Sequence, residues 1–155
     1  TNVFERNWAV LVPGSPSTAA EVRDAECRLA IRTDAFAARR LELSGTFAQL
    51  NATNRYEKSL SLQYRTIRPD GTIDDWQTVG EFKSTYTMAD GSPDLAGTQT
   101  NISCMADVRI PRGATVEARV YCRKANESGN EAPLGFCDFR VRVLGVGPSL
   151  LFVIR

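Results

Sequence analysis

Acidic side chains gather in two short stretches that could bind a cation. Asp70, Asp74 and Asp75 lie close together in the chain, and Asp90 and Asp94 follow further along. Carboxylate oxygens are calcium ligands, but neither stretch has the EF-hand spacing and no Glu closes the site. Because Asp also stabilises turns by local hydrogen bonds, we interpret these residues as solvated turn aspartates.

The chain contains no histidine, which excludes Ser-His-Asp and Cys-His nucleophilic catalysis and histidine metal sites. Glycoside hydrolysis needs two carboxyl groups held at a defined separation, and the sequence alone places no such pair. The stretch Gly145-Val146-Gly147 lacks the following helix that a phosphate-binding loop requires. We therefore expect a protein that is not an enzyme and that carries no cofactor and no metal.

Aromatic and sulfur-containing residues leave alternatives open. A sugar or peptide groove and ordinary strand packing are both compatible with the aromatic residues Tyr56, Tyr64, Trp76, Tyr86 and Tyr121, and packing is the simpler interpretation. The four cysteines lack the C-x-x-C spacing of zinc or redox sites. We interpret them as buried free thiols, with disulfides as the alternative: Cys27, Cys104, Cys122 and Cys137.

Composition indicates one ordinary soluble domain. The 155 residues are 43% hydrophobic and 24% charged, enough to bury a core without metals or disulfides. The net charge of +1 gives no general attraction to nucleic acid or to an anionic membrane. No stretch has the apolar length of a membrane span or a secretory signal. We expect neither a nucleic-acid partner nor a membrane partner.

Apolar and polar residues alternate with a period of two along most of the chain, which is typical of half-buried strands. The alternation predicts strands over 8–12, 27–32, 40–47, 60–64 and 76–82, with a tight turn at 68–71. A final strand over 135–146 is expected to carry Cys137, Phe139, Val141 and Val143 on one face. The only helical candidate is 17–25, which Ser17 would cap.

The segment 101–123 predicts a β-hairpin around a loop at 111–115. A register in which paired residue numbers sum to 226 sets Ile110 opposite Val116 on the apolar face. The same register sets two complementary charge pairs on the other face, Arg109 with Glu117 and Asp107 with Arg119. It also sets the sulfurs of Cys104 and Cys122 against each other on adjacent strands.

About eight antiparallel strands and at most one short helix predict an all-β fold, a single β-sandwich of jelly-roll type. The sandwich domain is expected over 14–147. An N-terminal arm or edge strand would occupy 1–13, and an apolar C-terminal arm or strand would occupy 148–155.

Large apolar residues stand at both ends of the chain, where solvent normally favours polar ones. Two interpretations are open for the C-terminal run: an edge strand docked on its own sheet, or a contact with another subunit or partner. Under the second interpretation the predicted interface consists of Phe4, Trp8, Val10, Val12, Leu151, Phe152 and Ile154.

Two families share parts of this pattern. Gly113 before the strand Thr115-Val116-Glu117-Ala118-Arg119-Val120-Tyr121, followed by Phe136-Cys137-Asp138-Phe139, resembles the closing strands of trimeric jelly rolls of the tumour-necrosis-factor type, although Asp138 stands where those domains often have Gly. Similar domains serve as head decoration or cement proteins and fibre knobs of tailed phages. Ser61-Leu62-Gln63-Tyr64-Arg65 with Trp76-Gln77-Thr78-Val79 is similar to the middle strands of fibronectin type III and immunoglobulin-like modules.

The first resemblance implies a structural protein at a virion surface that decorates and stabilises a capsid. Its partners would be further copies of itself, as a homotrimer, and the protein shell. The alternative is an extracellular adhesion module, immunoglobulin-like or fibre-knob-like, that binds a carbohydrate or a receptor.

Overall fold

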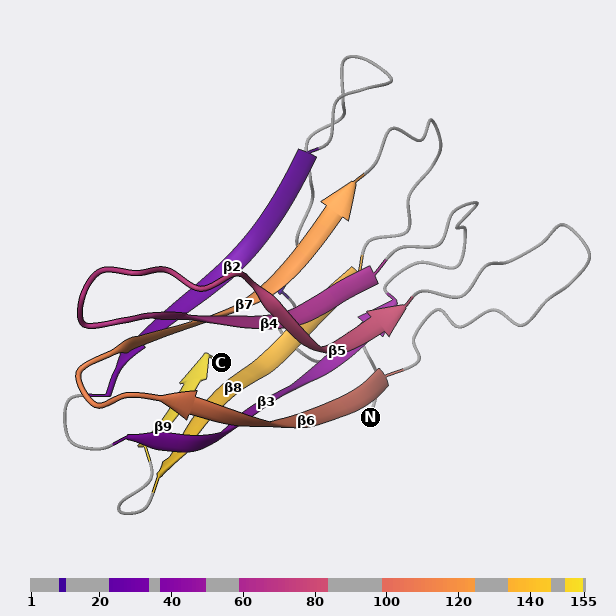
Figure 1. The fold of residues 1–155 in the computed structure, drawn as a ribbon. Helices are drawn as coiled ribbons and strands as arrows, with labels where there is room; N and C mark the ends of the chain where they lie inside the picture. Colours follow the sequence, from indigo (N-terminus) through magenta and orange to yellow (C-terminus); the bar gives the residue numbers. More distant parts are fainter. Residues whose placement is uncertain are drawn as a thin grey trace, which may run out of the picture.

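The computed structural model describes residues 9–10, 23–33, 37–49, 59–83, 99–124, 134–145 and 150–154, which form two antiparallel sheets packed face to face (Figure 1). One sheet contains β1 (Ala9–Val10), β8 (Leu134–Gly145), β3 (Ala38–Gln49) and β6 (Gln99–Ile110), and β9 (Leu150–Ile154) pairs with β8. The other contains β2 (Arg23–Arg32), β7 (Thr115–Lys124), β4 (Ser59–Ile67) and β5 (Gln77–Lys83). The predicted all-β sandwich is confirmed.

The core lies between the two sheets and is made of the apolar residues at alternate strand positions. Leu41, Leu43 and Phe47 of β3 are completely buried, as are Leu60 and Leu62 of β4. Full burial of such a side chain is worth about 1.5–3 kcal/mol. The Phe47 ring lies 5.8 Å from the ring of Phe82 on β5, so one aromatic stack joins the two sheets.

The predicted hairpin between β6 and β7 is wrong. β6 pairs with β3, whereas β7 pairs with β2 and β4, so residues 111–114 carry the chain from one sheet to the other. Gly113, at φ 82°, donates its N–H to the Thr33 carbonyl at 2.8 Å within this crossing. Ile110 and Val116 are both buried, as expected, but they belong to opposite layers of the sandwich.

The charge pairs and the thiol pair of that hairpin are separated for the same reason. Asp107 lies 3.4 Å from Arg40, and Glu117 bonds to Arg65 at 2.6 Å. Cys104 is paired with Leu43, and Cys122 with Ala25, so these two cysteines do not lie on adjacent strands. All four cysteines are free thiols, and only Cys122 is fully buried.

A β-bulge in β8 changes which residues face the core. Asp138 has a φ of 53°, and the pairing with β3 shifts between Ser44 and Thr46. Phe136 and Phe139 are consequently both buried although they are three positions apart. Cys137, which we expected in the buried row with Phe139, is displaced from it because an extra residue reverses the alternation.

The helix predicted over 17–25 is wrong where it can be compared. Residues 23–25 belong to β2 and pair with 122–124 of β7, and 17–22 lie outside the described residues. A thin apolar stripe is a weak helix signal, and pairing along the full edge of β7 overrides it. No described segment is a helix long and apolar enough to cross a membrane.

The edge between β5 and β6 closes through a contact that only glycine allows. A Cβ atom at Gly80 would collide with the Cys104 Sγ atom and would lie 3.6 Å from Ile102 Cγ2. The missing side chain on β5 therefore lets the thiol of β6 pack directly against the neighbouring sheet. Through this contact, β5 of one sheet and β6 of the other approach each other closely at one position.

We expect Gly80→Ala to lower the free energy of unfolding by about 1–3 kcal/mol, because the added methyl group overpacks the contact. The measurement is urea denaturation of four proteins: the parent chain, Gly80→Ala, Cys104→Ala and the double variant. Removing the sulfur should make the extra methyl group nearly harmless. An equal cost of Gly80→Ala with and without Cys104 would contradict the role given to this contact.

Candidate functional site

An open cleft lies between the β4–β5 hairpin and the end of β6. Its volume is about 580 Å³, within the roughly 300–1,000 Å³ of typical small-molecule sites. We call this space the cleft; its charged walls contain Arg65, Arg68, Asp74, Asp75, Asp107 and Arg109. Since β5 and β6 meet at Gly80 and Cys104, the cleft occupies the other part of this edge, near Gln77 and 107–110.

Tyr64 supplies the aromatic side chain of the cleft. It follows the buried Leu60 and Leu62 at alternate positions of β4, and it packs against the core while lining the cleft. Burial raises the pKa of its hydroxyl, and the nearby Asp74 carboxylate raises it further. The phenol is therefore protonated at neutral pH and can donate a hydrogen bond.

The turn between β4 and β5 forms a well-bonded wall of the cleft. The Asp70 carboxylate accepts the Thr72 backbone N–H at 2.9 Å, and this bond lowers the pKa of Asp70. Arg68 donates to both carboxylate oxygens of Asp74 at 3.1 and 3.3 Å. Gly71 has the φ of 87° that the turn requires. The predicted turn at 68–71 is confirmed.

The aspartates of the first acidic stretch are engaged as the turn interpretation predicts, not as cation ligands. Asp70 is bonded to the turn backbone and Asp74 to Arg68. Among the residues that the structure describes, no group of three or more His, Cys, Asp or Glu side chains could hold a metal ion. Asp90 and Asp94 lie outside the described residues.

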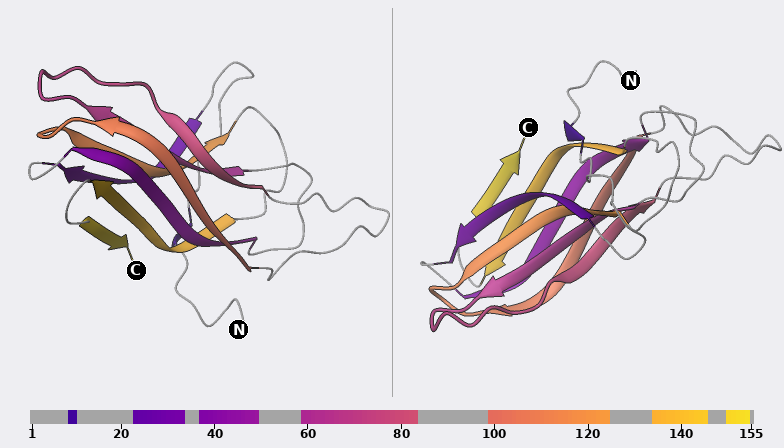
Figure 2. Two further views of the ribbon diagram at one scale, coloured as in Figure 1. Left: turned by 60° about the horizontal axis from the view of Figure 1, so that its bottom comes forward. Right: turned by 90° about the horizontal axis from the view of Figure 1, so that it is seen from above.

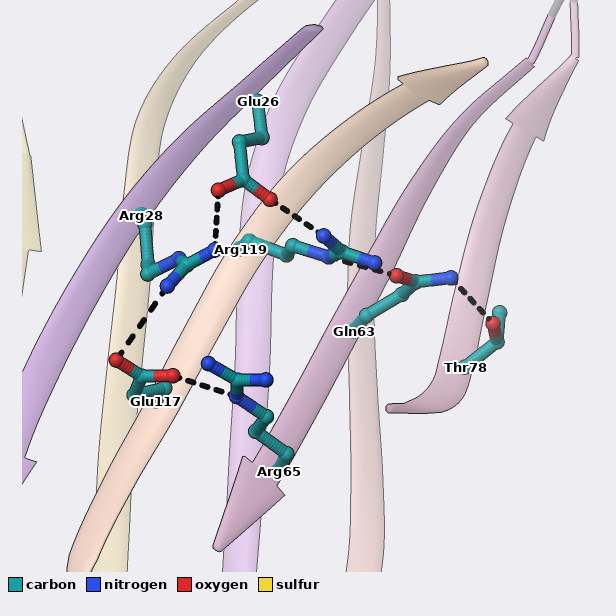
Figure 3. Close-up of polar contacts among 7 residues, drawn as sticks. All are labelled: Glu26, Arg28, Gln63, Arg65, Thr78, Glu117 and Arg119. Carbon is teal, nitrogen blue, oxygen red and sulfur yellow. Dashed lines mark hydrogen bonds and ion pairs between the residues drawn. The ribbon is translucent and has the colours of Figure 1, made fainter. Parts of the chain in front are cut away.

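The outer face of the β2–β7–β4–β5 sheet carries a connected polar network (Figure 3). Arg28 and Arg119 are directly paired across β2 and β7, which places like charges together. Glu26 bonds to both guanidinium groups, and Glu117 lies 3.6 Å from Arg28. Gln63 extends the network, accepting from Arg119 at 2.8 Å and donating to the Thr78 hydroxyl at 2.9 Å.

Trp76 covers this row of arginines. Its ring centre lies 3.9 Å from the guanidinium carbon of Arg119, 4.6 Å from that of Arg65 and 5.3 Å from that of Arg28. Arg119 also lies 4.1 Å from the ring centre of Tyr121. Cation–π contacts of this kind contribute about 0.5–2 kcal/mol each. The aromatic and charged groups of this face therefore satisfy one another, and we assign the face to stability.

Packing, the interpretation favoured from the sequence, holds for the aromatic residues that can be placed, and the groove alternative holds in addition for one of them. Tyr64 lines the cleft, whereas Trp76 and Tyr121 stack on arginines. Tyr56 and Tyr86 lie outside the described residues. As site residues, Asp74 and Asp75 were considered only as cation ligands. No sequence signal connects them with Asp107 and Arg109, because the cleft is lined by two separate segments, 64–77 and 107–110.

The structure places part of the predicted terminal interface. β9 runs beside β8, where Leu151 pairs with Arg142, Phe152 with Val141 and Ile154 with Phe139 (Figure 2). Val10 of β1 pairs with Gly135 of β8. The backbone of these strands thus belongs to the edge of their own sheet, and a contact with another subunit stays a prediction. Phe4, Trp8 and Val12 lie outside the described residues.

Comparison with known proteins finds structural neighbours only. No protein-family model matches the chain, and no curated protein does. The xylan-binding CBM22-1 domain of Paenibacillus barcinonensis Xyn10C matches 90% of this chain and 87% of its own, with a TM-score of 0.46 and 10% identity. The C-terminal family 22 carbohydrate-binding module of Clostridium thermocellum Xyn10B matches 95% of this chain and 94% of its own, with a TM-score of 0.43 and 9% identity.

These comparisons correct the expectation of a viral protein. The matched structures are carbohydrate-binding modules, so the description as a virion, capsid-decorating or cement protein is wrong. The strand pattern at 112–143 that suggested a viral protein is the apolar–polar alternation found in any β-sandwich. The resemblance to tumour-necrosis-factor-type and fibronectin-like domains gains no support from them either.

We expect the stabilising effect of Glu26 to depend on pH. Burial alone would raise the pKa of this carboxyl, but hydrogen bonds from Arg119 and Arg28 outweigh burial and hold it below its ordinary value of 4.5. A carboxyl with a lowered folded-state pKa stabilises the fold above its ordinary pKa, and the effect is lost as pH falls through the lower value.

The test compares urea midpoints of the parent chain and Glu26→Gln over a pH series. Glu26→Gln should be less stable near neutral pH, and the difference should shrink as the pH falls below 4.5. Thr78→Ala, which removes an uncharged group from the same network, is the control and should cost the same at every pH. A Glu26→Gln effect that is constant with pH would contradict the ion-pair role.

Proposed function

We propose that this chain is a non-catalytic carbohydrate-binding module that holds a glycan in the cleft between the β4–β5 hairpin and β6. The observation that carries the proposal is the combination of side chains in this one open space of about 580 Å³. Sugars present many hydroxyl groups as well as apolar ring faces, so a sugar site needs hydrogen-bonding side chains and an apolar or aromatic surface together.

The cleft contains both kinds of group. Asp75 and Gln77 are exposed and line it, and they offer a carboxylate acceptor and an amide that both donates and accepts. Tyr64 adds a protonated hydroxyl beside its ring. Ile73, which is 54% exposed, is an unusually accessible large apolar residue in the same wall. A polar rim around such a surface is typical of ligand-binding clefts.

The charges of the cleft favour binding over hydrolysis. Arg68 donates to Asp74, and Arg40 lies 3.4 Å from Asp107, so two of the three carboxylates of the cleft have an arginine partner. A glycosidase needs one carboxyl group with a raised pKa as a general acid and a second as base or nucleophile. Carboxylates that already have arginine partners are poorly suited to either role.

The glycan would be part of a larger polymer, and we place the protein outside the cell, where such polymers occur. The cleft is open to solvent, so a segment of a polymer could lie in it. Xylan is the first polymer to test, because the matched Paenibacillus domain is described as xylan-binding.

Asp75→Ala and Gln77→Ala should each weaken binding about fivefold, since each removes about one hydrogen bond worth roughly 1 kcal/mol. The measurement is affinity electrophoresis in gels containing xylan or another plant or microbial polysaccharide, followed by calorimetry with the best ligand. Thr78→Ala, on the outer face of the same hairpin, is the matched control and should bind as the parent does.

The same polymers test the absence of catalysis. Incubation with the purified chain should release no reducing ends. Turnover of any of them would contradict the non-catalytic assignment, and failure of every polysaccharide to bind would contradict the module itself.

A further inference from the structure

A second, smaller hollow of about 230 Å³ adjoins the cleft and carries positive charge only. We call it the basic hollow. Its charged lining residues are Arg39, Arg68 and Arg109, and apolar residues, among them Ala37, Ile110 and Pro111, form the rest of the lining. Arg68, Arg109 and Ile110 line the cleft as well. A ligand lying in the cleft therefore comes within reach of the basic hollow.

A β-bulge sets two of these arginines side by side. Ala38 pairs with Ile110 and Arg40 pairs with Asp107, so the single residue Arg39 lies opposite both Val108 and Arg109. Bulges of this kind re-aim side chains next to functional sites. Val108 is buried, whereas Arg39 and Arg109 are both exposed.

Arg39 and Arg109 differ from the neighbouring arginines, which are paired with carboxylates. Arg68 is bonded to Asp74, Arg65 to Glu117, and Arg40 lies beside Asp107. Within the described part of the chain, the guanidinium groups of Arg39 and Arg109 have no ion-pair or hydrogen-bond partner. Like charges at adjacent cross-strand positions repel, and a bound anion would remove this repulsion.

We propose that the glycan bound by this chain is anionic, and that its carboxylate or sulfate groups bind Arg39 and Arg109 in the basic hollow while its neutral sugar units lie in the cleft. Guanidinium groups bind oxyanions such as carboxylates and sulfates through charge-assisted hydrogen bonds, which are often paired. The net charge of +1 gives no general attraction to polyanions, so selectivity would come from these two positions. The inference rests on the proposed function and adds the chemical class of the ligand.

The experiment uses polymers that differ only in charge. Polygalacturonate is compared with its methyl ester, and glucuronoxylan with its carboxyl-reduced form; sulfated xylan distinguishes sulfate from carboxylate. The full chain should bind the acidic member of at least one pair more tightly by roughly tenfold. This preference should fall as salt is raised from about 50 to 500 mM, because the exposed charges become screened.

The variant Arg39→Ala should lose most of the preference for the acidic polymer and of its salt dependence while it keeps binding to the neutral one, because Arg39 lines the basic hollow but not the cleft. Arg39 is exposed, so the fold should survive, which circular dichroism and urea denaturation check. Arg140→Ala is the matched control: it removes an exposed arginine of β8 that lines neither space, so it changes the net charge by one without altering the cleft or the basic hollow. It should retain the preference.

Each remaining outcome decides between the two proposals. Equal binding of acidic and neutral polymers would overturn the anionic-ligand proposal and leave the carbohydrate-binding function standing. A preference that survives Arg39→Ala undiminished, or that Arg140→Ala abolishes, would also overturn it. Binding of none of these polymers, nor of any other polysaccharide, would overturn the proposed function itself.

Discussion

One apolar core shared by two sheets is the constraint on which the rest of this structure depends. Every long strand turns alternate side chains inward, and the stack of Phe47 on Phe82 joins the layers directly. Because one face of each strand must be buried, the polar residues between have only the outer faces and the open edges available. The charged network and the cleft both follow from that division.

The outer face of the β2–β7–β4–β5 sheet shows how such a division is stabilised. Two arginines placed opposite each other would destabilise the pairing of β2 with β7, but Glu26 lies between them and Trp76 covers them. The network crosses all four strands through Gln63 and Thr78 (Figure 3). Its groups are engaged with one another, and this is why an aromatic residue on a sheet face does not by itself mark a ligand site.

The edge between β5 and β6 contrasts with this outer face, whose polar groups are engaged with one another. Gly80 lets Cys104 close the two layers at one position, and beyond it the β4–β5 hairpin and β6 separate to form the cleft. Asp75 and Gln77 are exposed there and are not part of the core, so their chemistry is free to serve a ligand. The bulge at Arg39 adds a basic hollow to the same edge, where two cations remain for an external partner.

The sequence alone determined which residues face the core, since alternation at 27–32, 40–47 and 60–64 records burial residue by residue. It could not determine which strands are hydrogen-bonded neighbours. Ile110 and Val116 satisfy the same apolar pattern whether they pair in one sheet or meet across two, and only the tertiary structure separates β6 from β7. The sequence could not predict the bulge at Asp138 or the cleft, for a related reason. Periodicity reports the environment of each side chain, whereas register, sheet membership and the meeting of Tyr64 with 107–110 are set by backbone pairing between distant segments.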